Sequence, residues 1–463
     1  MTRKFLKTSL LRSSVLLVLV LIALLPSLAV AQAAPEPERE ILLNGLRILY
    51  WPQPGNPNVL LKLRIHSGAA FDLAGRDGMM ALLGDALFPD PATRDYVAEE
   101  LGGRLEVSTN HDAIDVTISG KAAGLERMID LLRGAVVTTQ LGAENVATLR
   151  ANRIKLLSEK PATASEMADQ AIAERLFGSF PYARVATGTA ASVAKIERAD
   201  LLLARERFLN ADNASLAIVG GVEKPRLMRA LRQLLGQWGK SDRTIPATFR
   251  QPGAPDPRVL ILDNPGSTNA DVRIAARGLA GGDNDAMAAK VLGLIIGYRW
   301  KAAVPELSDV SVRNHDRVLP GIFVLRASAP AATVAKALAA AQAISQSLTQ
   351  TGPTAQEVEN ARMLVLAQLS ADLSQPDTMA TRWLDMDTFK SSRPSTVATL
   401  IRNLTAADLQ RVAVKLFKGV PIATVIVGNS EQLKTAIGGN VELKSAVVPE
   451  VKPIDPVTQT KKP

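Results

Sequence analysis

The interpretation of this chain begins with one stretch, Gly78-Met79-Met80-Ala81-Leu82-Leu83-Gly84-Asp85-Ala86-Leu87-Phe88. Its apolar residues recur with helical spacing, at positions 79, 80, 82, 83, 86 and 87. Such spacing predicts a buried helix. A strand-like run at 59–66 and a loop rich in Gly and Asp precede it, and the segment Leu-Gly-Gly-Arg-Leu-Glu-Val-Ser-Thr-Asn follows at 101–110.

This order of elements resembles the start of the M16 metallopeptidases, the insulinase or mitochondrial-processing-peptidase-like family. In that family the helix carries an inverted zinc motif, His-x-x-Glu-His, inside a frame like Gly-Leu-x-His-x-x-Glu-His-Met-Leu-Phe. When the two are aligned on Gly78 and on the Leu-Phe pair at 87–88, the three chemical positions are Ala81, Gly84 and Asp85. The resemblance therefore implies that the helix is kept and that its chemistry is lost.

A catalytic zinc ion needs three protein ligands and one open position for water. The family's two histidines supply two ligands, and the Glu between them takes the proton of the zinc-bound water. Ala81 and Gly84 have no donor atoms, and Asp85 alone cannot hold a metal. The family's third ligand is a Glu on a long helix, expected here at 143–158, where the equivalent position falls at 153–155 and is basic. The resemblance implies no zinc, no cofactor and no catalytic residue.

Composition and length indicate a globular protein of two domains or more. The chain has 463 residues, of which 47% are hydrophobic and 21% are charged, and domains average roughly 100–200 residues. Cysteine is absent, which excludes disulfides and thiolate chemistry. Histidine occurs only at 66, 111 and 315, so a histidine metal site would require distant residues to converge.

Residues 1–31 read as a cleavable signal peptide, with a basic start, an apolar run at 15–25 and Ala-Val-Ala at 29–31. An uncleaved N-terminal anchor is the alternative, although a membrane span needs about 20 apolar residues. We expect export to the periplasm or beyond the cell, with no membrane span after cleavage. The lysines and arginines are scattered, which argues against nucleic-acid binding.

An internal repeat divides the remainder of the chain. Asp200 begins a helix that leads to a strand ending at Gly220, and Asp408 begins a helix that leads to a strand ending at Gly428, with equal spacing. A repeat of this length indicates a duplicated domain. We predict an α+β fold of two homologous M16/LuxS-like α/β-sandwich domains, each with an antiparallel-rich sheet packed against helices. The expected parts are a flexible leader at 32–40, an N-terminal domain at 41–238, a linker at 239–257, a C-terminal domain at 258–440 and a disordered tail at 441–463.

Within the first domain we expect strands at 41–50 and 59–66, and a further strand after the Gly-Gly pair at 102–103. In M16 enzymes the strand after the Gly-Gly pair accepts an extended peptide as an added strand, a mode that uses backbone hydrogen bonds. The resemblance therefore marks a candidate peptide-contact edge, whose alternative is an ordinary strand. Its residues are Leu105, Glu106, Val107, Ser108 and Thr109.

Four other positions carry expectations of their own. The run Phe-Pro-Tyr-Ala-Arg at 180–184 is similar to the family's His-Pro-Tyr-Gly-Arg, with Phe180 replacing His. The family's substrate-binding Arg and Tyr in the second half are both missing, and Ser311 stands near the Tyr position. Arg299 is expected to form a structural ion pair, and His111 is expected to lie on the surface.

The leading hypothesis is an exported pseudopeptidase without zinc-dependent proteolysis. M16 chains often work as pairs in which one subunit carries zinc, so this chain would be the non-catalytic subunit that helps to enclose or bind peptide. The alternative is a stand-alone peptide-binding or scaffold protein that is monomeric or self-associates. An active metallopeptidase with an atypical site is the third hypothesis.

Overall fold

The computed structural model describes residues 36–160, 162–241 and 246–445. The expected signal peptide and the end of the expected tail lie outside these residues. From Glu36 onward the chain forms one compact unit that contains two six-stranded sheets. We call residues 36–241 the first half and residues 246–445 the second half. No helix in the described part of the chain is both long enough and apolar enough to span a membrane.

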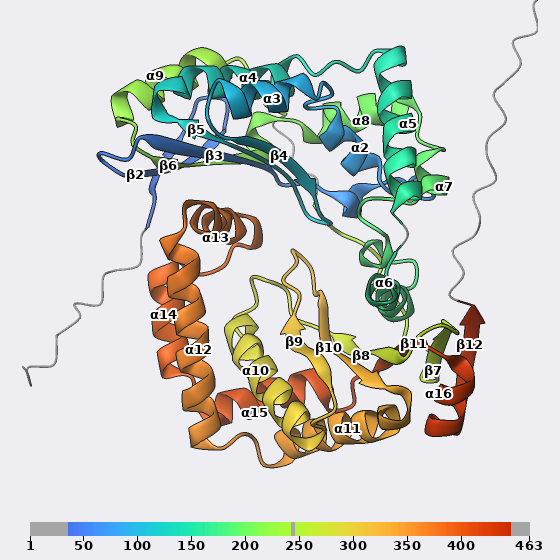
Figure 1. Cartoon of the computed structure of the whole chain (residues 1–463). Helices are drawn as coiled ribbons and strands as arrows, with labels where there is room; N and C mark the ends of the chain where they lie inside the picture. The colour runs from blue at the N-terminus through green and yellow to red at the C-terminus, as the bar shows by residue number, and fades with distance from the viewer. Residues whose placement is uncertain (1–35, 161, 242–245, 446–463) are drawn as a thin grey trace, which may run out of the picture. The chain divides into compact units, whose positions relative to one another are not determined.

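The first sheet has the strand order β1-β2-β6-β3-β5-β4 (Figure 1). β2 and β6 run parallel, and all other neighbours in this sheet are antiparallel. β4 is therefore an edge strand, as is β1 at the opposite side. The bounds are β1 (Glu38–Ile41), β2 (Arg47–Pro52), β3 (Asn58–Ile65), β4 (Arg104–Thr109), β5 (Ile114–Lys121) and β6 (Ala214–Gly220).

The second sheet repeats this arrangement in the order β12-β7-β11-β8-β10-β9. β7 and β11 run parallel, and the pairs from β11 to β9 are antiparallel, as in the first sheet. Five strands thus follow one topology in both halves, which confirms the predicted fold class. The bounds are β7 (Val259–Asp263), β8 (Asn269–Arg277), β9 (Ser308–Asn314), β10 (Ile322–Pro330), β11 (Ala423–Gly428) and β12 (Val441–Ser445).

Helices accompany both sheets, and several begin where side chains satisfy the free backbone N–H groups of the first turn. Thr354 and Glu357, three residues apart in the sequence, predict a capping box, and the structure has it at the start of α12. The first half contains α2 (Met79–Asp85), α3 (Ala92–Glu99), α4 (Leu125–Val137), α5 (Ala143–Glu159), α6 (Ala164–Phe177), α7 (Ala190–Val193), α8 (Arg198–Phe208) and α9 (Lys224–Leu235). The second half contains α10 (Ala286–Ala303), α11 (Val334–Gln350), α12 (Ala355–Ser374), α13 (Pro376–Phe389), α14 (Pro394–Asn403), α15 (Ala406–Phe417) and α16 (Ser430–Ile437).

Each half contributes one helix to the sheet of the other half. α13, from the second half, packs against β3 and β6 of the first sheet (Figure 1). Lys62 of β3 donates to Asp377 Oδ1 at 3.0 Å and to Thr381 Oγ1 at 2.7 Å. These acceptors are the second and sixth residues of α13, so the lysine fixes the first turns of the helix on the strand.

α6, from the first half, packs in return against β8 and β11 of the second sheet. Arg273 of β8 has a fully buried side chain, and it donates to Ser165 Oγ at 2.7 Å and to the carboxylate of Asp169. These are again the second and sixth residues of the helix. The duplication therefore extends to the contacts that hold the two halves together.

A buried charge cluster strengthens the contact of α13 with the first sheet. Arg64 of β3 is almost fully buried, and it donates to both oxygens of Asp115 on β5 at 2.7 and 2.8 Å. It also donates to Asp385 Oδ1 of α13 at 2.6 Å. Arg47 of β2 donates to Asp387 Oδ2 at 2.7 Å. Because a buried cation needs partners for its charge, these contacts favour one position of the helix.

Two boundary predictions are wrong by a few residues. The leader expected to be flexible through residue 40 ends in β1, which pairs with β2, and the single strand expected over 41–50 is interrupted by a turn. Gly45 has φ +85, a conformation that glycine adopts without strain, and it turns the chain back on itself. The tail expected from 441 begins with β12, which pairs in parallel with β7.

We predict that Arg64→Ala lowers the free energy of unfolding by about 3–5 kcal/mol, because it leaves the buried Asp115 and the partly buried Asp385 without their cation. Urea unfolding followed by circular dichroism measures this change. The matched control is Arg226→Ala, whose exposed pair with Glu126 contributes at most about 1 kcal/mol. Equal losses in the two variants would contradict the proposed role of the buried cluster.

Candidate functional site

The helix predicted within residues 78–88 is present as α2, from Met79 to Asp85. All of its residues except Asp85 are buried, as the apolar spacing predicted. The Asp72 carboxylate accepts the N–H of Gly78 at 2.7 Å and that of Met80 at 2.8 Å, so it satisfies the free donors of the first turn. Burial raises the pKa of Asp72 to about 7, although these two N–H donors oppose the rise.

The three motif positions lie where the resemblance places them, on one short helix. Ala81 is buried and carries only a methyl group. Gly84 faces β4 so closely that a Cβ atom there would lie 2.9 Å from Thr109 Oγ1. A glutamate at this position would therefore require Thr109 to move. Neither position offers a ligand or a base.

Asp85 is bound by an arginine from the next long helix. Arg153 of α5 donates from Nε to Asp85 Oδ2 at 2.7 Å and from Nη2 to Asp85 Oδ1 at 2.9 Å. The same Nη2 also donates to the carbonyl oxygen of Ala81 at 3.2 Å. The Arg153 side chain is only 11% exposed. The guanidinium thus joins the two helices that, in the zinc enzymes, carry the metal ligands.

The residues at this site do not fit a zinc ion. The only carboxylate among the motif positions already has both oxygens engaged by Arg153, and a fixed positive charge stands beside it. Among the described residues, no group of three or more His, Asp or Glu side chains is placed to hold a metal. An aspartate–arginine pair of this kind can fix two helices together, but it has no open coordination position at which to activate water.

The candidate peptide edge lies directly beside this helix. β4 is the last strand of the first sheet and pairs only with β5 among the described residues. Asn110 N–H donates to Ala113 O at 3.0 Å, and hydrogen-bonded and non-hydrogen-bonded pairs alternate along an antiparallel ladder. The backbone groups of Leu105, Val107 and Thr109 therefore point to the outer side of the sheet, away from β5.

Other residues singled out from the sequence have structural partners. Arg299 donates to both carboxylate oxygens of Glu357 at 2.6 and 2.8 Å, which confirms the expected ion pair. Tyr182, from the Phe-Pro-Tyr motif, donates to Asp112 Oδ1 at 2.8 Å and accepts the N–H of Leu319 at 3.1 Å. The tyrosine therefore connects the two halves. Ser311 lies in β9.

His111 is not a surface residue, so that prediction is wrong. Its Nε2 donates to the carbonyl oxygen of Arg184 at 3.0 Å, and its ring packs edge-on against Tyr182. Its Nδ1 is buried and has no hydrogen-bond partner in the described part of the chain. The turn in which His111 lies is covered by residues distant in sequence, which no local pattern indicates.

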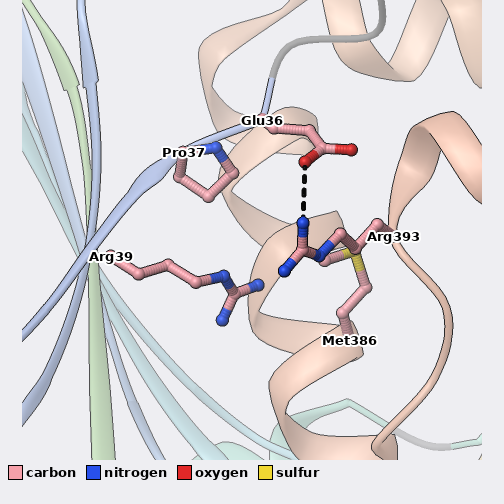
Figure 2. A pocket seen from close by; sticks show the side chains of 5 residues that line it. All are labelled: Glu36, Pro37, Arg39, Met386 and Arg393. Carbon is pink, nitrogen blue, oxygen red and sulfur yellow. Dashed lines mark ion pairs between the residues drawn. The ribbon is translucent and has the colours of Figure 1, made fainter.

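Two concave regions lie elsewhere on the molecule, and neither includes a residue of α2 or β4. A pocket of about 240 Å³ is lined by residues of the β1 and α13–α14 regions, with the Glu36–Arg393 pair at its mouth (Figure 2). A groove of about 700 Å³ runs along α9. The degenerate motif itself is therefore a packed helix contact beside an open strand edge, rather than a cavity.

Fold and site together define an α+β protein of two similar halves, in which an ion pair between Asp85 and Arg153 joins α2 to α5. Residues 195–365 match a family model described as the peptidase M16 inactive domain. A protein from Rickettsia bellii (strain RML369-C), described as an uncharacterized zinc protease, is 21% identical over 212 residues, which cover 44% of this chain and 50% of that protein. This chain therefore matches only about half the length of that relative.

Solved structures share the fold at low identity. A peptidase M16 inactive domain from Pseudomonas fluorescens matches with a TM-score of 0.75 at 18% identity, over 85% of this chain and 98% of that chain. The first half of the periplasmic protease PqqL from Escherichia coli matches with a TM-score of 0.70 at 16% identity, over 87% and 95%. The resemblance to M16 peptidases drawn from the sequence is confirmed by the matched family model and by these shared folds.

Restoring the ligands tests whether the Arg153 guanidinium lies at the lost metal position. We predict that the variant Ala81→His/Asp85→His/Arg153→Glu gains a zinc site of about one ion per chain, because three ligands then face one point. Metal analysis after equilibrium dialysis measures the gain. The control Ala81→His/Asp85→His keeps the arginine and should hold no zinc. Equal zinc uptake by both variants would contradict this placement.

His111 gives a prediction for pH. Burial, with a further contribution from the nearby Arg317, lowers the pKa of His111 to about 4, against 6.5 in an exposed histidine. Between these values the unfolded chain binds a proton that the folded chain does not, so stability falls as the pH is lowered from 6.5 towards 4. We expect His111→Gln to remove a slope of about 1.4 kcal/mol per pH unit, measured by urea unfolding at several pH values. Identical slopes in variant and wild type would contradict the assignment.

Proposed function

We propose that this protein is an exported, non-hydrolytic M16-type protein that binds extended peptide along β4 and acts as the non-catalytic subunit of a zinc-bearing M16 peptidase. The observation that carries the proposal is the pairing of Asp85 with Arg153 next to an unpaired strand edge. The ion pair occupies the carboxylate that could bind a metal, and the unpaired edge of β4 leaves backbone groups with which a peptide can pair.

The physical basis of peptide binding here is addition of a strand. The outward backbone groups of Leu105, Val107 and Thr109 form a row of donors and acceptors that a peptide can pair with, without any metal. Leu105 is buried, whereas Glu106 and Ser108 are exposed, so the strand keeps one packed face and one solvated face. Backbone pairing of this kind favours extended peptides of many sequences.

The proposed partner and compartment are supported by the solved relatives and by the N-terminal sequence. M16 chains often work in pairs, and one solved neighbour is described as half of a periplasmic protease. The expected signal peptide at 1–31 agrees with a periplasmic or secreted protein. Co-purification with a chain that has an intact His-x-x-Glu-His motif would support the subunit role.

A stand-alone peptide-binding or scaffold protein is the second candidate. The observation that favours it is the absence of the family's Arg and Tyr from the second half, because a supporting subunit ordinarily supplies them to substrate. Here Arg299 is engaged by Glu357 and Ser311 stands near the Tyr position. Self-association without a zinc-bearing partner would select this candidate. Chelator-sensitive cleavage by the pure protein would overturn both candidates in favour of an atypical metallopeptidase.

We predict that Val107→Pro weakens the binding of an unstructured peptide about tenfold or more, because proline removes an outward N–H donor. Val107 N–H does not take part in the β4–β5 ladder, so the fold should persist, as circular dichroism will check. Fluorescence anisotropy with a labelled extended peptide measures binding. The control Val107→Ala keeps the N–H and should bind like wild type. Unchanged binding in the proline variant would rule out β4 as the peptide edge.

A further inference from the structure

The outer surface of α9 is strongly cationic. The helix carries Lys224, Arg226, Arg229 and Arg232 and has no acidic residue between 224 and 235. The groove of about 700 Å³ along this helix is lined by Lys224, Pro225, Met228, Arg229, Arg232 and Gln233. α9 lies near β1, because Lys224 pairs with Glu38 and Glu40 of that strand, and β1 and β4 are the opposite edges of the first sheet.

Only part of this positive charge is balanced within the chain. Lys224 Nζ lies 2.8 Å from a carboxylate oxygen of Glu38 and 2.8 Å from one of Glu40, both on β1. Arg226 is paired with a glutamate of α4. Arg229 and Arg232 are exposed, and neither has an ion pair or hydrogen bond to another described residue. The glutamates of β1 thus place carboxylates beside α9. Arg232 lies within electrostatic range of Glu40 but forms no close ion pair with it.

Among the described residues β1 pairs only with β2, so no described strand lies along its outer edge. Leu42 N–H donates to Leu46 O at 3.0 Å, so the alternation of an antiparallel ladder directs the backbone groups of Arg39 and Ile41 away from β2. The strand ends in two unusually exposed apolar side chains. Ile41 is 71% exposed and Leu43 is fully exposed, the two highest values among the large apolar residues of the described chain.

We propose that this edge is a docking site for an extended, acidic segment of a partner protein, which adds to β1 as a further strand. Successive side chains of a strand point to opposite faces. Every second residue of the added strand therefore faces α9, where Asp or Glu would meet Arg229 and Arg232. The residues between them face the other side, where apolar groups would cover Ile41. Charge complementarity and the exposed apolar end both favour this occupant.

This site is independent of peptide binding at β4, because it uses the opposite edge of the sheet and different residues. The two proposals can therefore fail separately. An unpaired edge with exposed apolar residues is otherwise a site of non-specific association, and natural proteins usually protect such edges. The charges along α9 would restrict pairing at this edge to acidic segments.

The test uses the mature protein carrying Val107→Pro, which removes β4 as a second binding edge. It uses two labelled ten-residue peptides, one with Glu and one with Lys at every second position, and with Val and Thr between. Fluorescence anisotropy should show binding of the Glu peptide only, weakened by salt because the contacts are exposed. Arg229→Gln/Arg232→Gln should reduce its affinity about tenfold, because two ion pairs with the peptide are lost. The matched control Arg226→Gln removes the same kind of charge outside the groove and should bind like wild type.

Backbone pairing is tested with the Glu peptide methylated on alternate backbone nitrogens. In the Val107→Pro protein, one of the two methylation registers should abolish binding of the Glu peptide while the other preserves it. Equal binding of the Glu and Lys peptides, or no effect of either methylation, would overturn the proposal. Binding to anionic vesicles in place of the peptide would assign α9 to a membrane surface, and concentration-dependent self-association lost in the double variant would assign it to a second copy; either result also overturns the proposal.

Discussion

The structure depends on the covering of each half's sheet by a helix from the other half. A sheet that packs helices on one face leaves its second face to be covered or solvated. Here α13 covers β3 and β6, and α6 covers β8 and β11. Because the cations on these strands are buried, they require fixed partners, and the partners come from the other half. Neither half therefore has a complete set of contacts by itself, which explains why residues from 36 onward form one compact unit.

The Asp85–Arg153 pair has a comparable role on a smaller scale. In a zinc enzyme of this family, the metal would hold the motif helix to the following long helix, and removal of its ligands would remove that contact. In this chain the Arg153 guanidinium joins the two helices instead, through two charged hydrogen bonds to the Asp85 carboxylate. The pair also neutralises a half-buried aspartate. The contact between α2 and α5 therefore does not require a metal ion.

Much of the fold was predictable from local patterns. The apolar spacing of α2 predicted a buried helix, the Thr354–Glu357 spacing predicted the start of α12, and the equal spacing of Asp200–Gly220 and Asp408–Gly428 predicted two like halves. α13 was missed, although its aspartates are conspicuous. Their partners lie far away in sequence: Arg64 and Asp385 are 321 residues apart. Similarly, a basic residue was expected at 153–155, but only the structure places Arg153 on Asp85. The opposite charges at these two positions were the available signal.

The order of strands in the first sheet determines the distance between the two proposed binding edges. β1 and β4 are the first and last of six strands, and neighbouring strands lie about 4.8 Å apart. The two edges are therefore separated by about 24 Å across one sheet, measured along its hydrogen-bonding direction. Occupation of one edge leaves the backbone groups of the other free. A protein that holds a partner at β1 and an extended peptide at β4 would place the peptide at a fixed distance from that partner. Neither edge would depend on a metal ion, because strand addition draws on backbone groups and needs no catalytic side chain.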